Sequence, residues 1–281
     1  MINKDFHYHC PNLISYSHRF LPASKKQHLS YVSESHRLVE IMLVVQGKMH
    51  YNIDGAQYVA NAGDIAVINA GEFHSSRASH VTLCERQILH FSTSSIPVFK
   101  SVAPMQAFQK TSLYQHIIPK EVVQKTKMLS LFKKIEALCK KDDLYKDLKL
   151  FSLLISCIAE LNFAVDLLTT KNHYITSPIT TNDLFKSTIN YINENIQKPL
   201  PISKVAQYIG VSESYLHRLF KKNMGISILN YIQNQKMQLA LSLLRKGHSA
   251  QSVSEMVGYE YYATFSNVFK KIFEVSPSEF K

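Results

Sequence analysis

The chain contains little cysteine, and the four residues it has are not grouped. Cys10, Cys84, Cys139 and Cys157 are scattered through 281 residues without a CxxC pair. Zinc knuckles and disulfide frameworks need closely spaced cysteines, so neither is predicted. Isolated thiols of this kind fit a reducing compartment such as the cytoplasm.

Long apolar runs are also missing. The first residues, MINKDFHYHCPNL, contain no apolar stretch of the kind found in a signal peptide. The most apolar segment, LFSLLISCIAELNFAVDLL, is interrupted by Ser152, Ser156, Glu160 and Asn162, whereas a bilayer span needs about 18 or more apolar residues. We therefore expect an amphipathic helix here, no membrane partner and a cytoplasmic protein.

Acidic residues are in the minority. The chain has 32 Lys and Arg against 21 Asp and Glu, a formal net charge of +11. The excess is densest in residues 183–281, which hold 12 basic and 7 acidic side chains. This balance favours an acidic partner such as nucleic acid, although basic surfaces also occur without such a function.

Residues 12–91 have the pattern of an all-β domain. Short runs rich in Val, Ile and Tyr alternate with turn signals, namely EIMLVVQG, HYNIDGAQYVA, NAGDIAVINAGEFH and VTLCERQILHFS. Asp54 and Gly55 supply the positive φ angles of a tight hairpin. The pattern predicts a sandwich or barrel. The preceding DFHYHC is expected to be an arm over a pocket or a frayed end.

Helical periodicity begins near residue 120. Two helices are predicted at 121–141 and 144–168, and the polar segment 169–182 is the predicted linker. Everything after it has helical character. We therefore expect one domain at 1–168 and a second, all-α domain at 183–281.

One helical element occurs twice in the second domain. SESYLHRLFKK (212–222) returns 49 residues later as YYATFSNVFKK (261–271). Together with the segments before them, the copies predict helix-turn-helix units at about 202–222 and 250–272, joined by a helix at 227–246. A helix of ~20 residues is about 30 Å long, close to the ~34 Å between successive major-groove faces. The predicted N-caps are Ser212, Ser227, Ser249 and Thr264.

The first copy pairs an apolar stripe with a polar face. Burying Leu216, Leu219 and Phe220 presents the other face to a partner. Arg218 on that face has the geometry to pair with a guanine edge in the major groove. The predicted DNA contacts are Ser212, Ser214, His217, Arg218, Lys221 and Lys222. A single helix of this type is often only a solvated surface helix; its repetition favours DNA binding.

The second copy keeps the apolar stripe and the Lys-Lys pair but has Asn267 where the first copy has Arg218. Its predicted contacts are Tyr262, Ala263, Thr264, Asn267, Lys270 and Lys271. Because it lacks a guanidinium fork, we expect it to read fewer bases and to dock mainly on phosphates.

These C-terminal residues resemble the AraC/XylS family of bacterial transcription regulators. The resemblance lies in VAQYIGVSESYLHRLFKKNMGISILNYI, LALSLL, VGYEYYATFSNVFKK and SPSEF. It implies a homodimer that places two helix-turn-helix units per chain on promoter DNA and works with RNA polymerase. The chain departs from the family pattern at Lys236, Ser254, Tyr261, Asn267 and Glu274, and all but Lys236 lie in the second unit.

Residues 36–74 resemble the cupin-like sensor barrel of the same family. His36, Glu40, Gly47, Gly63, Gly71 and His74 have the motif spacing, whereas Glu34 and Asn69 replace a usual histidine and proline. The resemblance implies a small-molecule effector, often a sugar, and the candidate contacts are His36, Glu40, Tyr51 and His74. His36, Glu40 and His74 also suit a metal site, but their use as hydrogen-bonding groups explains them equally; we predict no metal, cofactor or catalytic residue.

The predicted function is therefore a DNA-binding transcription regulator, an activator controlled by a small molecule in the barrel. Two alternatives stay open: a ligand-independent regulator whose barrel only dimerises, and a metal-dependent cupin enzyme with a DNA-binding tail. The helices at 121–141 and 144–168 carry more apolar surface than a barrel needs. They predict a dimer interface, or packing against the barrel's own face, or both.

Overall fold

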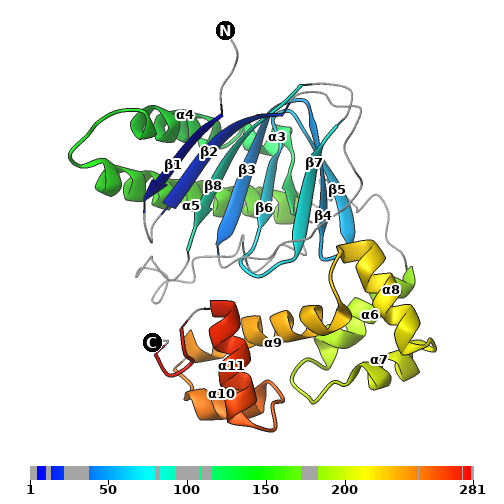
Figure 1. Cartoon of the computed structure of the whole chain (residues 1–281). Helices are drawn as coiled ribbons and strands as arrows, with labels where there is room; N and C mark the ends of the chain where they lie inside the picture. Colours follow the sequence, from blue (N-terminus) through cyan, green and yellow to red (C-terminus); the bar gives the residue numbers. More distant parts are fainter. Residues whose placement is uncertain are drawn as a thin grey trace. The chain divides into compact units, whose positions relative to one another are not determined.

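The computed structural model describes residues 5–10, 14–21, 38–79, 83–92, 108, 116–171, 183–245, 247–273 and 275–279. The chain divides near residue 180 into two compact units (Figure 1). We call them the N-terminal unit (described residues 5–171) and the C-terminal unit (described residues 183–279). The expected fold class, a cupin-like β domain followed by helices and a separate all-α domain, is confirmed.

The described strands of the N-terminal unit form two antiparallel sheets. One has the order β1-β2-β8-β3-β6-β9 and the other the order β5-β4-β7. The strands are Phe6–Cys10 (β1), Ile14–Leu21 (β2), Val39–Gln46 (β3), Lys48–Ile53 (β4), Ala56–Asn61 (β5), Ile65–Ile68 (β6), His74–Ala78 (β7), Cys84–Phe91 (β8) and Ile117–Ile118 (β9). The β4–β5 hairpin turns at Asp54 and Gly55, whose φ angles are +45° and +82°, as expected.

Alternation along the strands separates two hydrophobic cores. In β3, Ile41 and Leu43 belong to a core shared with the helices. Met42 and Val44 point the other way, into a core between the two sheets that also holds Tyr51. Successive side chains of a strand leave opposite faces of the sheet, so the six-stranded sheet has one face toward the helices and one toward the barrel interior. We call the latter the interior face.

The segment DFHYHC belongs to the sheet. All five residues of β1 pair with β2, from Phe6 opposite His18 to Cys10 opposite Ile14. The expectation of an arm or a frayed end is therefore wrong. Its His and aromatic residues alternate along an edge strand, with Phe6 and Tyr8 packed against the helix-facing core.

The helix expected at 121–141 is divided into α3 (Lys120–Val123) and α4 (Met128–Cys139). Thr126 Oγ1 donates to the carbonyl of Val123 at 2.7 Å and accepts from the amide of Met128 at 3.2 Å. These local bonds compete with the continuous helical pattern and end one helix where the next begins. The apolar periodicity alone did not reveal this interruption.

Helix α5 (Lys146–Lys171) lies along the outside of the six-stranded sheet with α4 (Figure 1). It continues to Lys171, so the segment 169–182 expected as linker begins with helical residues; residues 172–182 lie outside the described part. By length and composition the stretch Lys146–Thr169 would suffice for a membrane span. One face of it is nonetheless buried in the helix-facing core, through Leu150, Leu154, Cys157, Leu161 and Val165.

The C-terminal unit contains two short helical groups at opposite ends of α9 (Figure 1). Its described helices are Asp183–Glu194 (α6), Ile202–Ile209 (α7), Glu213–Met224 (α8), Ile228–Arg245 (α9), Ala250–Met256 (α10) and Tyr262–Phe273 (α11). Helix α9 has 18 residues and so is about 27 Å long.

The helix caps were mostly predicted. Ser212, Ser227 and Ser249 each accept an amide hydrogen in the first turn of the following helix. Thr264 does not cap α11, because that helix begins at Tyr262 and the amide of Thr264 bonds to the carbonyl of Tyr261 at 3.1 Å.

Candidate functional site

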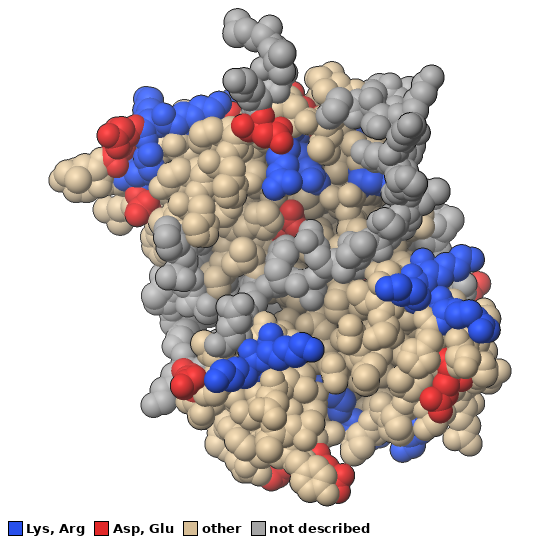
Figure 2. All heavy atoms as spheres, viewed as in Figure 1, with Lys and Arg blue, Asp and Glu red and all other residues tan. Residues whose placement is uncertain are grey.

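Helix α8 presents the first set of predicted DNA contacts. Leu216, Leu219 and Phe220 are at most 5% exposed, and Phe220 packs against the rings of Phe185 and Tyr231. Burial of this stripe leaves Ser214, His217, Arg218 and Lys222 exposed. Figure 2 shows Lys and Arg side chains gathered over α8. This slim, cationic face suits the major groove.

Two of the predicted contacts also shape α8 itself. The Ser212 hydroxyl accepts from the amide of Tyr215 at 3.2 Å. At the other end, Lys221 Nζ donates to the carbonyl of Gly225 at 2.8 Å. A cation here also complements the negative end of the helix dipole. Lys222 makes no such described bond and is the better candidate for a purely electrostatic phosphate contact.

Helix α11 presents the second set of predicted DNA contacts. Phe265 and Phe269 are fully buried, while Val268 is only half-buried. Ala263, Thr264, Asn267, Lys270 and Lys271 are exposed. Tyr262 is half-buried and its ring lies 6.0 Å from that of Phe265, so it partly serves the core. The neighbouring Tyr261 is 65% exposed.

Lys236 joins the two halves of the C-terminal unit. From α9, its Nζ donates to the carbonyl of Lys198, just before α7, at 2.8 Å, and to that of Val257, after α10, at 2.5 Å. The ammonium also lies 5.4 Å from the centre of the Tyr259 ring. Burial lowers the pKa of Lys236 to about 8. One side chain thus bonds to the backbone just before the first helix-turn-helix unit and to the backbone of the second.

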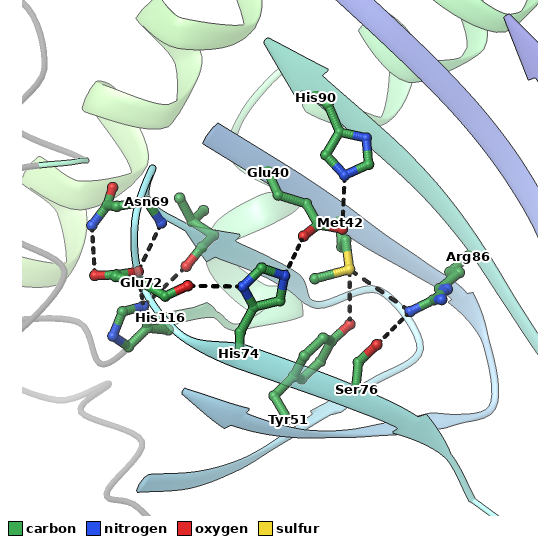
Figure 3. A network of polar contacts seen from close by, with 11 residues as sticks. Glu40, Met42, Tyr51, Asn69, Glu72, His74, Ser76, Arg86, His90 and His116 are labelled. Atoms are coloured by element: carbon green, nitrogen blue, oxygen red, sulfur yellow. Dashed lines mark hydrogen bonds and ion pairs between the residues drawn. The ribbon is translucent and has the colours of Figure 1, made fainter. Parts of the chain in front are cut away.

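The N-terminal unit brings two of its predicted effector contacts together. Glu40 on β3 lies between two histidines, with Oε2 at 3.1 Å from Nε2 of His74 and Oε1 at 3.2 Å from Nε2 of His90 (Figure 3). The other ring nitrogen of His74 lies 3.0 Å from the carbonyl of Glu72. Both nitrogens of His74 therefore lie within hydrogen-bond distance of oxygen atoms, one from a side chain and one from the backbone.

Tyr51, the third described candidate, lies on the opposite sheet. It is 1% exposed and donates toward the sulfur of Met42 at 3.7 Å. Arg86 Nη1 approaches the same sulfur at 3.9 Å and donates to Ser76 Oγ at 2.8 Å (Figure 3). Burial raises the pKa of Tyr51 above its usual range, so its hydroxyl stays a donor.

Sequence reasoning missed Arg86, His90 and Ser76. The alternation of side chains along β8 could have indicated two of them. Arg86, Ile88 and His90 alternate with residues of the helix-facing core and therefore lie on the interior face. His36 lies outside the described residues, so its place beside Glu40 and His74 is not tested. In the described part of the chain, no group of three or more His, Cys, Asp or Glu side chains could hold a metal ion.

Two known sequence families match the chain, one in each unit. An AraC-like ligand-binding domain matches residues 23–155, and a helix-turn-helix domain matches residues 205–281.

Curated relatives match about a third of the chain. The transcriptional regulatory protein HptR of Staphylococcus aureus is 34% identical over 92 residues, 33% of this chain and 36% of that protein. The lactose operon transcription activator of Staphylococcus xylosus is 36% identical over 101 residues, 36% of each chain. The matched segment thus spans about a third of these relatives.

Among solved structures, the C-terminal domain of AraT, a response regulator from Geobacillus stearothermophilus, is 29% identical, covering 36% of this chain and 84% of that one, with a TM-score of 0.34. ToxT from Vibrio cholerae is 14% identical and covers 95% of this chain and 97% of that one, with a TM-score of 0.37.

Proposed function

The chain belongs to the AraC family of regulators, and from this premise we propose that it activates transcription by binding promoter DNA under the control of a small molecule. The small molecule binds inside the N-terminal barrel. Its binding changes how the C-terminal unit engages DNA, because it favours one of two arrangements of the protein. The name of the lactose operon activator supports activation.

The observation that carries the proposal is the pair of exposed cationic helices, α8 and α11, at opposite ends of one helix. Each keeps its apolar stripe in the core and its Lys pair in solvent. The ~27 Å of α9 approaches the ~34 Å between successive major-groove faces. Helices α8 and α11, held apart by α9, therefore suit adjacent major grooves on one face of the DNA.

The protein acts as a homodimer in the cytoplasm, on two half-sites, and contacts RNA polymerase there. Exposed apolar side chains on α5, including Leu148 and Phe163, support a dimer interface. The role is non-enzymatic, in keeping with a family of transcription regulators.

A ligand-independent regulator is the second candidate. The exposed apolar face of α5 would serve such a protein equally well, since dimerisation needs no effector. The polar side chains on the interior face, among them Glu40 and Arg86, favour sensing instead. Burying polar groups costs free energy unless they are hydrogen-bonded, and a bound ligand would supply hydrogen-bond partners.

Sequencing genomic DNA retained by the purified protein tests the DNA-binding part. We expect a common motif with two blocks about one helical turn apart, each contacted by one helix-turn-helix unit. Retention of random DNA with no shared motif would contradict sequence-specific regulation. Repeating the selection with cell extract metabolites, and comparing the retained promoters, separates a ligand-controlled regulator from a ligand-independent one.

A further inference from the structure

Arg86 is a cation on the interior face whose described partners are neutral. Nη1 donates to the Ser76 hydroxyl and approaches the Met42 sulfur, and the guanidinium also interacts with the Tyr51 hydroxyl. Its Nε is buried with no hydrogen-bond partner among the described residues. No ion pair found among the described residues includes Arg86. A guanidinium in such surroundings binds carboxylate or phosphate oxygens well, because neutral acceptors offset its loss of water poorly.

The Tyr51 hydroxyl is a second hydrogen-bond donor whose described acceptor is weak. This hydroxyl and Arg86 Nη1 both point at the sulfur of Met42, and a thioether is a weak acceptor. Tyr51 is 1% exposed, so bulk water does not replace the missing acceptor. The Tyr51 hydroxyl and Arg86 also interact with each other, so two donors converge beside a thioether and neutral hydroxyl oxygens.

Arginines outnumber acidic side chains on the interior face of the described strands. Glu40 is the acidic side chain that the described strands place on the interior face, and it is held between His74 and His90. Arg19 on β2 lies directly opposite Arg86, so both side chains leave the same face. Like charges in directly opposed positions destabilise a sheet, and an anion between them removes that cost. Ser76 is exposed, so solutes reach this side of the cluster.

We propose that the barrel binds an anionic small molecule, a carboxylate or a phosphate ester, with its anionic group on Arg86 and with Tyr51 and Ser76 as further donors. The Ser76 hydroxyl accepts from Arg86 and donates its own hydrogen to the anion. The inference rests on the proposed function only in taking the bound molecule to be the effector.

Thermal unfolding of the full chain tests the site with defined probes. The carboxylate probes are acetate and glycerate, the phosphate probes are inorganic phosphate and glycerol 3-phosphate, and glycerol is the neutral analogue. Sodium chloride matches the ionic strength. We expect either the carboxylates or the phosphates to raise Tm, and comparing the two sets of probes shows which class binds. Arg86→Gln should weaken that anion about ten- to a hundredfold, since it removes charge-assisted hydrogen bonds.

Arg77→Gln is the matched control. Arg77 neighbours Ser76 on β7 but leaves the opposite face of the strand, so its loss should leave the anion response intact. Without anion, Arg86→Gln should keep or raise Tm, whereas loss of a structural arginine would lower it. Should Arg86→Gln fail to fold, Tyr51→Phe gives a second reading and should also weaken the anion.

The outcomes separate the site from its role. Absence of any anion-specific shift in the wild type, or an equal shift in Arg86→Gln, overturns the anion site. Stabilisation of both proteins by a neutral probe such as lactose would overturn it while supporting ligand sensing. If the anion binds through Arg86 but leaves promoter affinity unchanged, the site stands and the proposed effector control is wrong.

Discussion

Arg218 and Asn267 occupy equivalent positions on α8 and α11, and both are exposed. A guanidinium forms two parallel hydrogen bonds to guanine, whereas an amide pairs best with adenine. Under the proposed function, the two helices therefore read bases with different strength on similar scaffolds. Most base readout belongs to α8 under the proposed function.

Arg218→Ala should cost about 1–3 kcal/mol of binding to the selected promoter and relax preference at one base pair. Asn267→Ala should cost less. Competition gel shifts with single-base operator variants measure both effects. Lys222→Ala is the contrast: it should weaken all sequences alike and reduce the salt slope by about one. A larger loss for Asn267→Ala than for Arg218→Ala would reverse the ranking of the two helices.

Lys236 makes a pH-dependent contribution to stability. Its pKa is about 8 when folded and about 10.4 in an unfolded chain. Between these values the unfolded state binds more protons, so stability from this group rises with pH. Lys236→Met should cost about 1–3 kcal/mol by leaving carbonyls without a donor, and the wild-type advantage should grow from pH 8 toward about 10.

Urea unfolding followed by far-UV circular dichroism at several pH values measures this advantage. Lys222→Met removes an exposed lysine from the same unit and should show no such growth. An advantage that is constant or shrinks as pH rises would show that Lys236 is not held in the manner described.

At the scale of elements, the turn after α10 is packed more tightly than the turn of the first helix-turn-helix. Gly258 (φ +72°) and Gly210 (φ +77°) both have left-handed backbone. A Cβ on Gly258 would lie 2.5 Å from the carbonyl carbon of Lys198 and 2.8 Å from Lys236 Nζ, whereas a Cβ on Gly210 meets nothing within 4 Å. The two glycines thus share a backbone conformation, but Gly258 is closely packed and Gly210 is not.

Gly210→Ala should cost about 1–2 kcal/mol through backbone strain alone. Gly258→Ala should cost about 3 kcal/mol, because the methyl must displace backbone. Amide hydrogen exchange of α9, α10 and α11, read by mass spectrometry, localises the effect. Equal losses at the two glycines would mean that the contact between Lys198 and Gly258 is not stabilising.

For the whole molecule, α5 decides the oligomeric state under the proposed function. Leu148 and Phe163 are 69% and 48% exposed, although the opposite side of the same helix is buried in the helix-facing core. Apolar surface of this kind on a folded protein marks a contact site. A second copy of the chain, related by twofold symmetry, suits it.

The double variant Leu148→Asp, Phe163→Asp should weaken self-association at least about tenfold, as measured by sedimentation equilibrium. Val45→Asp, at a 39% exposed apolar position on β3, is the control and should leave it unchanged. A variant that stays as dimeric as the wild type would place the interface elsewhere.

The features that depend on local pattern were predictable. The repeat of 212–222 in 261–271, the caps at Ser212 and Ser249, and the hairpin at Asp54-Gly55 are all set by residues close in sequence. They determined the two-unit fold and the two exposed cationic helices. Two expectations from local pattern were wrong. The Thr126 hydroxyl bonds to the backbone where the helix expected at 121–141 is interrupted, and α11 begins at Tyr262, before the cap expected at Thr264.

Only the tertiary structure decided which side chains distant in sequence contact one another inside each unit. Arg86 and Met42 meet across 44 residues, and Lys236 reaches carbonyls 38 and 21 residues away. Such contacts depend on strand register and helix packing, where a shift of one residue turns a side chain to the other face. The sequence by itself therefore determined that this protein has two exposed cationic helices and a barrel, and the packing determined which cations lie on the interior face.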